Sequence, residues 1–300
     1  MRIMLFDCAV IGGGPAGMTA SLVLGRARRK IILFDDNKPR NAVTKESHGF
    51  LTRDGVKPSE LKKIAHEELS NYPTVILKKT EVVQISKKEK LFSIETIEGG
   101  VYSARKIIFA TGIKEVLPNI EGMHSFYGKS IFSCPYCDGW ELKDKVIAII
   151  SNHQAIFEMI KLVYNWSKNL IVCTDGSNTI RNEERNELER RGIRLFNQKM
   201  KQIVGNEGMV KAIKFVDDTE VSIEGGFITP EWVPTTSIAQ SLGCELDEKD
   251  GLNTDALGRT NIEGVYAAGD VTTPSQVIIA AGEGSKAAIG VNTDLTIEDF

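Results

Sequence analysis

The chain has 300 residues, of which 42% are hydrophobic and 26% charged, and its formal net charge is −3. This composition is typical of a globular protein of about two domains and excludes a fibrous or disordered chain. The nearly balanced charge gives no reason to expect nucleic acid or an anionic membrane as a partner. No apolar run reaches the roughly 18 residues that a spanning helix needs, so we expect a cytoplasmic protein.

The first predicted unit is strand–helix–strand (βαβ). Residues 4–11 are mostly apolar and lead into a turn that contains Gly12, Gly14 and Gly17. An Ala- and Leu-rich helix is predicted over 16–28, and a short buried strand over 30–35.

A second βαβ pattern begins near Lys145. In chain order, the other predicted elements are a loop at 36–57, a helix at 59–72, strands within 75–110, a strand at 146–150, a helix at 154–166, a strand at 170–173, a charged helix at 181–191, short strands within 193–223, a strand that ends at Asp270 and a helix at 276–291. Two such patterns favour an α/β fold of two Rossmann-like, three-layer (ββα) dinucleotide-binding domains, one inserted in the other. We expect residues 1–114 and 226–300 to form one discontinuous domain around an inserted domain at 115–225.

The glycine-rich turn has the spacing of a dinucleotide site. Gly12-x-Gly14-x-x-Gly17 allows a tight turn, close approach of the backbone to a pyrophosphate, and close helix–strand packing. Asp35 ends the next strand, where an acid can bind ribose hydroxyls. A glycine-rich turn alone could be an ordinary loop, but the strand, the helix and the acid together favour a nucleotide site.

Two later segments distinguish flavin from nicotinamide. Val265–Asp270 places an acid at the end of an apolar strand, directly before a helix. It resembles the second FAD motif of the flavoprotein disulfide reductases with two dinucleotide folds, and Ala110-Thr111-Gly112 resembles their middle motif. Alone, the segment that ends at Asp270 could equally be a tight turn. In this order along the chain, the motifs indicate FAD.

Cys134-Pro135-Tyr136-Cys137-Asp138-Gly139 is the most specific feature. Two thiols at this spacing can cycle between dithiol and disulfide, and an adjacent acid can carry the proton that thiol exchange requires. The alternatives are half of a metal site or two buried apolar cysteines. No second Cys pair or ligand-spaced histidines accompany the motif, which argues against a metal.

Together, these motifs resemble the low-molecular-weight thioredoxin reductase family over nearly the whole chain. The resemblance implies that Cys137 is the thiol nearer the flavin, that Cys134 attacks the substrate disulfide, and that Asp138 is the acid/base. It also implies a homodimer, with a thioredoxin-like protein or a small-molecule disulfide as partner. The positions that it assigns to FAD are Gly12, Gly14, Pro15, Ala16, Gly17, Asp35, Arg40, Asn41, His48, Val82, Ala110, Thr111, Gly112, Gly269, Asp270, Gln276 and Val277.

The segment from Arg40 to Leu51 resembles a subgroup that includes bacterial reductase-like proteins and fungal dithiol oxidases. In this interpretation His48 lies near the flavin. The alternative is a loop histidine that is hydrogen-bonded to the backbone.

The inserted domain departs from the family pattern. Where the family has Gly-x-Gly-x-x-Ala for NADPH, this chain has Ser151-Asn152-His153-Gln154-Ala155, without glycine. Each Cβ there keeps the backbone away from a pyrophosphate. Thr174-Asp175-Gly176 stands where the family has basic residues, and an acid repels a 2′-phosphate. We therefore regard NAD(P)H as a doubtful cofactor of the inserted, NAD(P)H-binding-like domain.

The sequence thus predicts an FAD-dependent thiol–disulfide oxidoreductase that passes electrons between FAD, the Cys134/Cys137 pair and a disulfide substrate. Its electron donor could be ferredoxin or another reductant. Two alternatives stay open: a dithiol oxidase that uses oxygen, and a non-catalytic, flavin-bound redox sensor.

Overall fold

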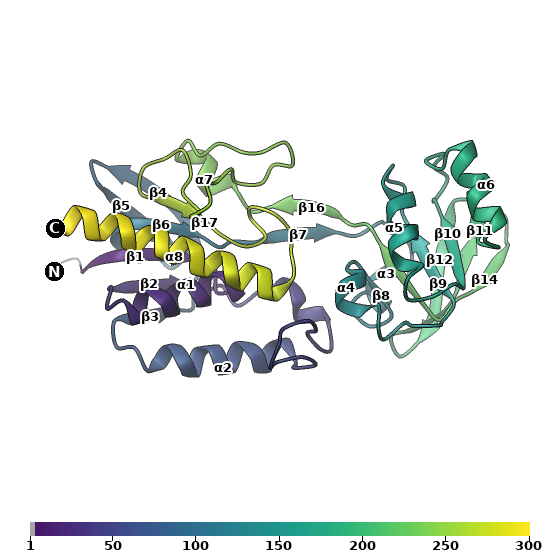
Figure 1. Ribbon diagram of the computed structural model, residues 1–300, viewed down its shortest axis with the longest axis horizontal. Coiled ribbons are helices and arrows are strands. Elements are labelled where there is room, and N and C mark those ends of the chain that lie inside the picture. Colours follow the sequence, from purple (N-terminus) through teal and green to yellow (C-terminus); the bar gives the residue numbers. More distant parts are fainter. Residues whose placement is uncertain (1–3) are drawn as a thin grey trace. The chain divides into compact units, whose positions relative to one another are not determined.

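The computed structural model describes residues 4–300 (Figure 1), and the chain divides into two compact units. Unit 1 contains the N-terminal segment to Ala42, Gly49–Lys114 and Trp232–Phe300. Unit 2 contains Val43–His48 and Glu115–Glu231. The return to unit 1 thus follows Glu231, whereas the sequence suggested a boundary at 225/226, because the strand at Gly225–Ile228 completes the sheet of unit 2.

Unit 1 is built on a seven-stranded sheet of order β3-β2-β1-β6-β5-β4, with β17 paired to β6. The strands are β1 (Leu5–Ile11), β2 (Ile31–Phe34), β3 (Val75–Lys78), β4 (Val82–Lys88), β5 (Leu91–Thr96), β6 (Val101–Phe109) and β17 (Val265–Ala267). The helices are α1 (Pro15–Arg26), a 3-10 helix at Arg40–Val43 that leads out of the unit, α2 (Pro58–Ser70), α7 (Ser237–Ser241) and α8 (Val277–Asp299). Strands β3, β2, β1, β6 and β17 run parallel, whereas β5 and β4 run antiparallel to their neighbours.

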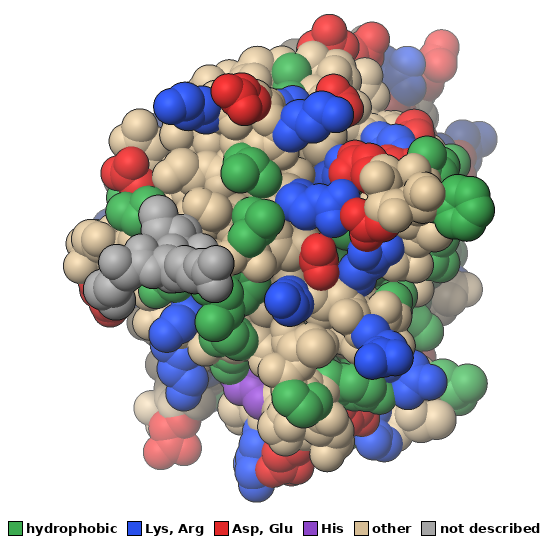
Figure 2. Space-filling model, turned by 90° about the vertical axis from the view of Figure 1, so that its left-hand side faces the viewer, with side chains coloured by type: hydrophobic (Ala, Val, Ile, Leu, Met, Phe, Trp, Pro, Cys, Tyr) green, Lys and Arg blue, Asp and Glu red, His purple; other side chains and the backbone are tan. Residues whose placement is uncertain are grey.

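The parallel strands of unit 1 are buried on both faces. Val10 belongs to the core cluster under α1 and α8, and the next residue, Ile11, belongs to the cluster that α7 and the loop after it cover. Successive side chains of a strand point to opposite faces, so each fully apolar strand has a helix layer on one side and a second layer on the other. Figure 2 shows the face of unit 1 at which α8 ends, where acidic, basic and apolar side chains are interspersed and neither sign of charge dominates.

Unit 2 contains a five-stranded parallel sheet of order β11-β10-β9-β15-β8 and a three-stranded antiparallel sheet of order β12-β13-β14. The strands are β8 (Ile131–Phe132), β9 (Ile147–Ile150), β10 (Leu170–Cys173), β11 (Arg194–Phe196), β12 (Met200–Asn206), β13 (Met209–Phe215), β14 (Glu220–Ser222) and β15 (Gly225–Ile228). The helices are α3 (Met123–Phe126), α4 (Pro135–Asp138), α5 (Ile156–Val163) and α6 (Asn182–Arg190). The strands β7 (Ile113–Val116) and β16 (Glu231–Pro234), where the chain leaves and re-enters unit 1, pair with each other.

Helix α8 is longer than the sequence suggested, because it continues past Val291 to Asp299. Its last two turns look polar in sequence, but Leu295 is buried and Glu298 pairs with Arg105. Within residues 4–300, none of the helices combines the length and the apolar character required to cross a membrane.

Candidate active site

The carboxyl ends of four strands meet at one edge of the sheet in unit 1. In the register of the sheet, Ile11 is opposite both Phe34 and Phe109, and Phe109 is opposite Ala267. The residues that follow these strands, which include Gly12, Asp35, Ala110 and Ala268, therefore lie together. Ligands of open α/β sheets bind at such an edge.

The glycine-rich turn leaves its backbone accessible at this edge. A Cβ on Gly12 would lie 2.1 Å from the carbonyl oxygen of Ala110, and one on Gly17 would lie 1.9 Å from that of Gly12. These two glycines thus permit the tight turn and the close packing. Gly14, the N-cap of α1, has no heavy atom within 4 Å of a Cβ position and receives no side-chain cap. The start of α1 is therefore free to accept an anion.

Two acids of the pocket are each paired with a base. Asp35 Oδ2 lies 2.6 Å from Lys62 Nζ, and Asp270 Oδ2 lies 3.0 Å from an Arg40 guanidinium nitrogen. Gly13 permits this arrangement, because a Cβ there would lie 2.4 Å from the Asp35 carboxyl carbon. The sequence did not single out Lys62, which occupies an ordinary polar position of an amphipathic helix.

The pocket at this edge lies wholly within unit 1. It is lined by Gly12, Gly13, Gly14, Pro15, Ala16, Asp35, Asp36, Lys38, Pro39, Arg40, Asn41, Lys62, Ala110, Thr111, Gly112, Ile113, Ala268, Gly269, Asp270, Ser275, Val277 and Ala280. The other residues assigned to FAD from the sequence lie outside this lining. Gly17 packs under the turn, Val82 is in the core, Gln276 is the N-cap of α8, and His48 belongs to unit 2. An uncapped helix start, a glycine cradle and two acids fit a dinucleotide such as FAD.

The cysteine motif of unit 2 forms a disulfide. Cys134 and Cys137 are bonded, with their Cα atoms 5.3 Å apart. Cys134 is the N-cap of α4, and Pro135 follows at the first helical position, which suits its fixed φ. The backbone N–H groups of Cys137 and Asp138 both donate to the Cys134 carbonyl oxygen, at 3.1 Å. The short helix thereby holds both sulfurs and the acid in one turn.

Burial raises the pKa of Asp138 to about 7, and the nearby Glu141 carboxylate adds to this effect, whereas His48 opposes it. The His48 Nε2 atom lies 3.7 Å from Glu141 Oε1 and 3.7 Å from Glu46 Oε2. A carboxyl group with this pKa can give or take a proton near neutral pH.

Aromatic side chains surround the disulfide turn. Gly139 is required for this packing, because a Cβ there would lie 2.8 Å from the Trp166 ring and 2.4 Å from the Pro135 carbonyl oxygen. Tyr136 packs edge-on against Trp166, with ring centroids 5.7 Å apart. Tyr136 and Trp140 are 64% and 67% exposed, so a partner can approach the disulfide over an aromatic surface.

The corresponding strand end of unit 2 differs from that of unit 1. After β9, the His153 N–H donates to Ser151 Oγ at 3.1 Å, and the Ala155 N–H donates to His153 Nδ1 at 3.1 Å. Ala155 is the N-cap of α5. Side chains of the turn itself therefore accept N–H groups that a glycine turn would direct at a phosphate.

The loop after β10 is also internally bonded. Thr174 Oγ1 donates to the Ser177 carbonyl oxygen at 2.7 Å, and Asp175 Oδ1 accepts the Met200 N–H at 2.8 Å. Arg181 pairs with Glu184 in the first turn of α6, with Nε 2.9 Å from Oε1. Arg181, the first basic residue after this loop, is thus engaged with Glu184 at the start of the helix.

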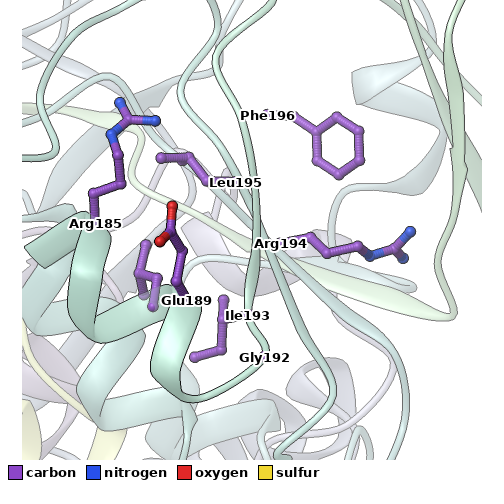
Figure 3. Close-up of a pocket in the computed structure, with 8 residues that line it drawn as sticks. Arg185, Glu189, Gly192, Ile193, Arg194, Leu195 and Phe196 are labelled. Atoms are coloured by element: carbon purple, nitrogen blue, oxygen red, sulfur yellow. The ribbon is translucent and has the colours of Figure 1, made fainter.

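A shallow groove lies between α6 and β11. Figure 3 shows Arg185 and Glu189 on α6, with Leu195 directed toward the helix, whereas Arg194 and Phe196 extend from the other side of the strand. The two arginines therefore do not converge on one point, as a phosphate site would require. Within unit 2, α6 and the disulfide helix α4 lie on opposite sides (Figure 1).

The family model of the pyridine nucleotide-disulphide oxidoreductases matches residues 6–284. The chain is 45% identical to a Bacillus anthracis structure that carries the name thioredoxin reductase TrxB, with a TM-score of 0.95 over 98% of this chain and 100% of that one. It is 29% identical over 314 residues to thioredoxin reductase aclD of Aspergillus oryzae, which is 100% of this chain and 99% of that protein.

A shorter match joins the chain to a fungal relative from Arthroderma benhamiae that also carries a thioredoxin reductase name. The two are 33% identical over 178 residues, which are 57% of this chain and 44% of that protein. The comparisons confirm the predicted α/β fold with two Rossmann-like domains and the predicted FAD cofactor. The chain therefore belongs to the pyridine nucleotide-disulphide oxidoreductase family, as a thioredoxin reductase-like flavoprotein disulfide oxidoreductase.

Proposed function

We propose that the protein passes electrons between FAD, held by unit 1, and the Cys134–Cys137 pair of unit 2, and then exchanges them with a disulfide substrate. The observation that carries this proposal is the disulfide itself, which is followed directly by a carboxyl group whose pKa is about 7. Such a carboxyl group can serve the proton transfers of thiol exchange at neutral pH.

FAD would be held in the pocket at the sheet edge, with its pyrophosphate at the start of α1 and its hydroxyl groups at Asp35 and Asp270. Bound there, it supplies a two-electron acceptor and donor. Lys62 and Arg40 hold the two carboxylates in place through their ion pairs. We propose that unit 1 is the FAD domain and that unit 2 is the inserted, NAD(P)H-binding-like domain.

In the reductive direction, the Cys134 thiolate attacks the substrate disulfide, so that a mixed disulfide forms and one substrate sulfur leaves with the electron pair. Asp138 gives that sulfur its proton. Cys137 then loses its proton to Asp138 and attacks the Cys134 sulfur, which restores the enzyme disulfide. The second substrate sulfur leaves with the electron pair and takes that proton from Asp138. Two electrons and two protons reach the substrate. A substrate dithiol reduces the enzyme disulfide by the reverse sequence.

We further propose that NADPH is not an efficient donor. The turn after β9 supports this, because Ser151 and His153 accept backbone N–H groups of the turn that would otherwise face a pyrophosphate. The loop after β10 supports it too, because Asp175 stands where a 2′-phosphate would need bases. We therefore propose ferredoxin or a dithiol as the electron donor.

The donor is tested by mixing the flavin-loaded protein, without oxygen, with dithiothreitol, NADPH, NADH and reduced ferredoxin in turn, while the visible flavin absorbance is followed. We expect rapid bleaching by dithiothreitol, and bleaching by NADPH that is at least about 100-fold slower, since a lost phosphate cradle costs several kcal/mol. Rapid bleaching by NADPH would overturn this interpretation of unit 2.

Two alternatives make different predictions in the same experiment. A dithiol oxidase would be bleached by dithiol and would recover its colour quickly in oxygen, with one oxidised dithiol per turnover. A redox sensor would be bleached by no donor or would not turn over. The intact Cys134–Cys137 pair beside Asp138 favours an enzyme over a sensor.

We propose a thioredoxin-like protein or a small-molecule disulfide as the exchange partner, since the A. oryzae relative is named as a thioredoxin reductase. The exposed aromatic rings of Tyr136 and Trp140 beside the disulfide support an apolar partner surface. We also propose a cytoplasmic homodimer. Light scattering tests the assembly, and a mass twice the 33.1 kDa of the chain is expected.

A further inference from the structure

The segment Val43–His48 belongs to unit 2, although the chain on both sides of it belongs to unit 1. It packs closely on the turn before β8. A Cβ on Gly128 would lie 2.6 Å from the Val43 carbonyl oxygen, and Gly128 has a φ of 75° that suits glycine. The close contact anchors the start of the segment, so that its far end, His48, has a defined place in unit 2.

His48 is held among the carboxylates beside the disulfide helix. Its Nε2 atom lies 3.7 Å from Glu141 Oε1 and 3.7 Å from Glu46 Oε2, and its side chain is 18% exposed. Glu141 follows Asp138 by three residues, just beyond the end of α4. Two segments that are distant in sequence thus place an imidazole beside a second carboxylate, and both groups act electrostatically on the acid of the cysteine motif.

The groups that act on Asp138 oppose each other. Burial and the Glu141 carboxylate favour its neutral form, whereas His48 favours its charged form. Glu46 lies 3.7 Å from the His48 imidazole and helps to keep it in place. Burial, the Glu141 carboxylate and the His48 side chain therefore act together on the pH at which Asp138 can accept a proton.

We propose that His48, Glu141 and Asp138 act as one proton-transfer unit of the disulfide reaction, in which His48 is a positioning residue that works through Asp138. This inference rests on the proposed function, because it concerns the same dithiol–disulfide exchange. When a substrate dithiol attacks Cys134, the new sulfur–sulfur bond forms, the bond to Cys137 breaks, and the electron pair stays on the Cys137 sulfur. The proton of the attacking thiol passes to the Asp138 carboxylate.

The test is the pH dependence of flavin bleaching by excess dithiothreitol without oxygen. The limb of the pH profile that is lost in Asp138→Asn is the one that depends on the Asp138 carboxyl group. Relative to the wild type, we expect His48→Gln to raise the midpoint of that limb, and His48→Arg and Glu141→Gln to lower it. Each shift should be roughly 0.5 to 1 pH unit, the size expected of one nearby charge. Opposite shifts at position 48 cannot come from a loss of packing.

His124→Gln is the control, because His124 is exposed on α3 of the same unit, and it should leave the midpoint unchanged. A readout that does not depend on turnover is the titration of the Asp138 carboxyl carbon, followed by NMR in the oxidised protein. The midpoint of this NMR titration should shift in the same directions as the bleaching midpoint in each variant that folds. If the wild type bleaches but all midpoints and titrations coincide, the inference is wrong and the proposed function stands. If dithiothreitol does not bleach the wild type, both fail.

Discussion

The carboxyl group of Asp138 is held neutral by its surroundings over the acidic range. Its pKa of about 7 comes first from burial and then from Glu141, with His48 acting in the opposite direction. This arrangement lowers the free energy of unfolding, since the folded protein keeps a proton on Asp138 that the unfolded chain has already lost. The acid of the cysteine motif is therefore a residue at which activity and stability compete.

Replacing Asp138 by Asn should stabilise the protein at neutral and alkaline pH. The folded-state pKa lies above the value of about 3.9 in unfolded chains, so the wild type loses stability as the pH rises from about 4 to about 7, and no further above it. Asn keeps the shape without the charge. At pH 8 we expect Asp138→Asn to have a higher free energy of unfolding in urea than the wild type, by on the order of 4 kcal/mol, with a difference that vanishes near pH 4. A difference independent of pH would contradict this account.

Helices α1 and α8 meet at a contact that has no room for a side chain. A Cβ on Gly284 would lie 2.1 Å from the carbonyl oxygen of Ala16, which itself lines the pocket that we propose holds FAD. The contact between the two helices therefore connects the packing of unit 1 to the shape of this pocket.

Gly284→Ala should loosen both the fold and the pocket. Overpacking at this backbone contact is expected to cost about 1 to 3 kcal/mol in urea unfolding and to weaken FAD retention in fluorescence titrations. Gly282→Ala is the matched control on the same helix, because nothing lies within 4 Å of its Cβ position. It should raise stability by about 0.5 to 1 kcal/mol. If both variants behave alike, the contact has no such role.

Elements with strong local patterns could be predicted from the sequence, and contacts between distant segments could not. The strand at Leu170–Cys173 is a fully apolar run, and the structure has it at those residues. The last turns of α8 were missed because their partners, such as Arg29 and Arg105, are far away in sequence. Lys62 was missed for the same reason, since its pairing with Asp35 depends on the placement of α2.

At the scale of the whole molecule, the proposed electron path joins a pocket in one unit to a disulfide in the other. The motifs for the pocket and for the disulfide can be recognised in the sequence, since glycine spacing and paired cysteines are local patterns. The placement of Val43–His48 with unit 2 had no such signal, because it depends on packing against Gly128. The cysteine pair thus follows from a local pattern, whereas the position of His48 next to Glu141 depends on contacts between distant segments.

The most direct test of the central claim is a comparison of the wild type with Cys137→Ser, both loaded with FAD and mixed with excess dithiothreitol without oxygen. The claim is that dithiol electrons reach the flavin through the Cys134–Cys137 pair. The wild-type flavin should bleach, and so should that of Cys244→Ser, a control at a buried cysteine of unit 1. The Cys137→Ser flavin should keep its colour. Bleaching of Cys137→Ser at the wild-type rate would contradict the proposed electron path.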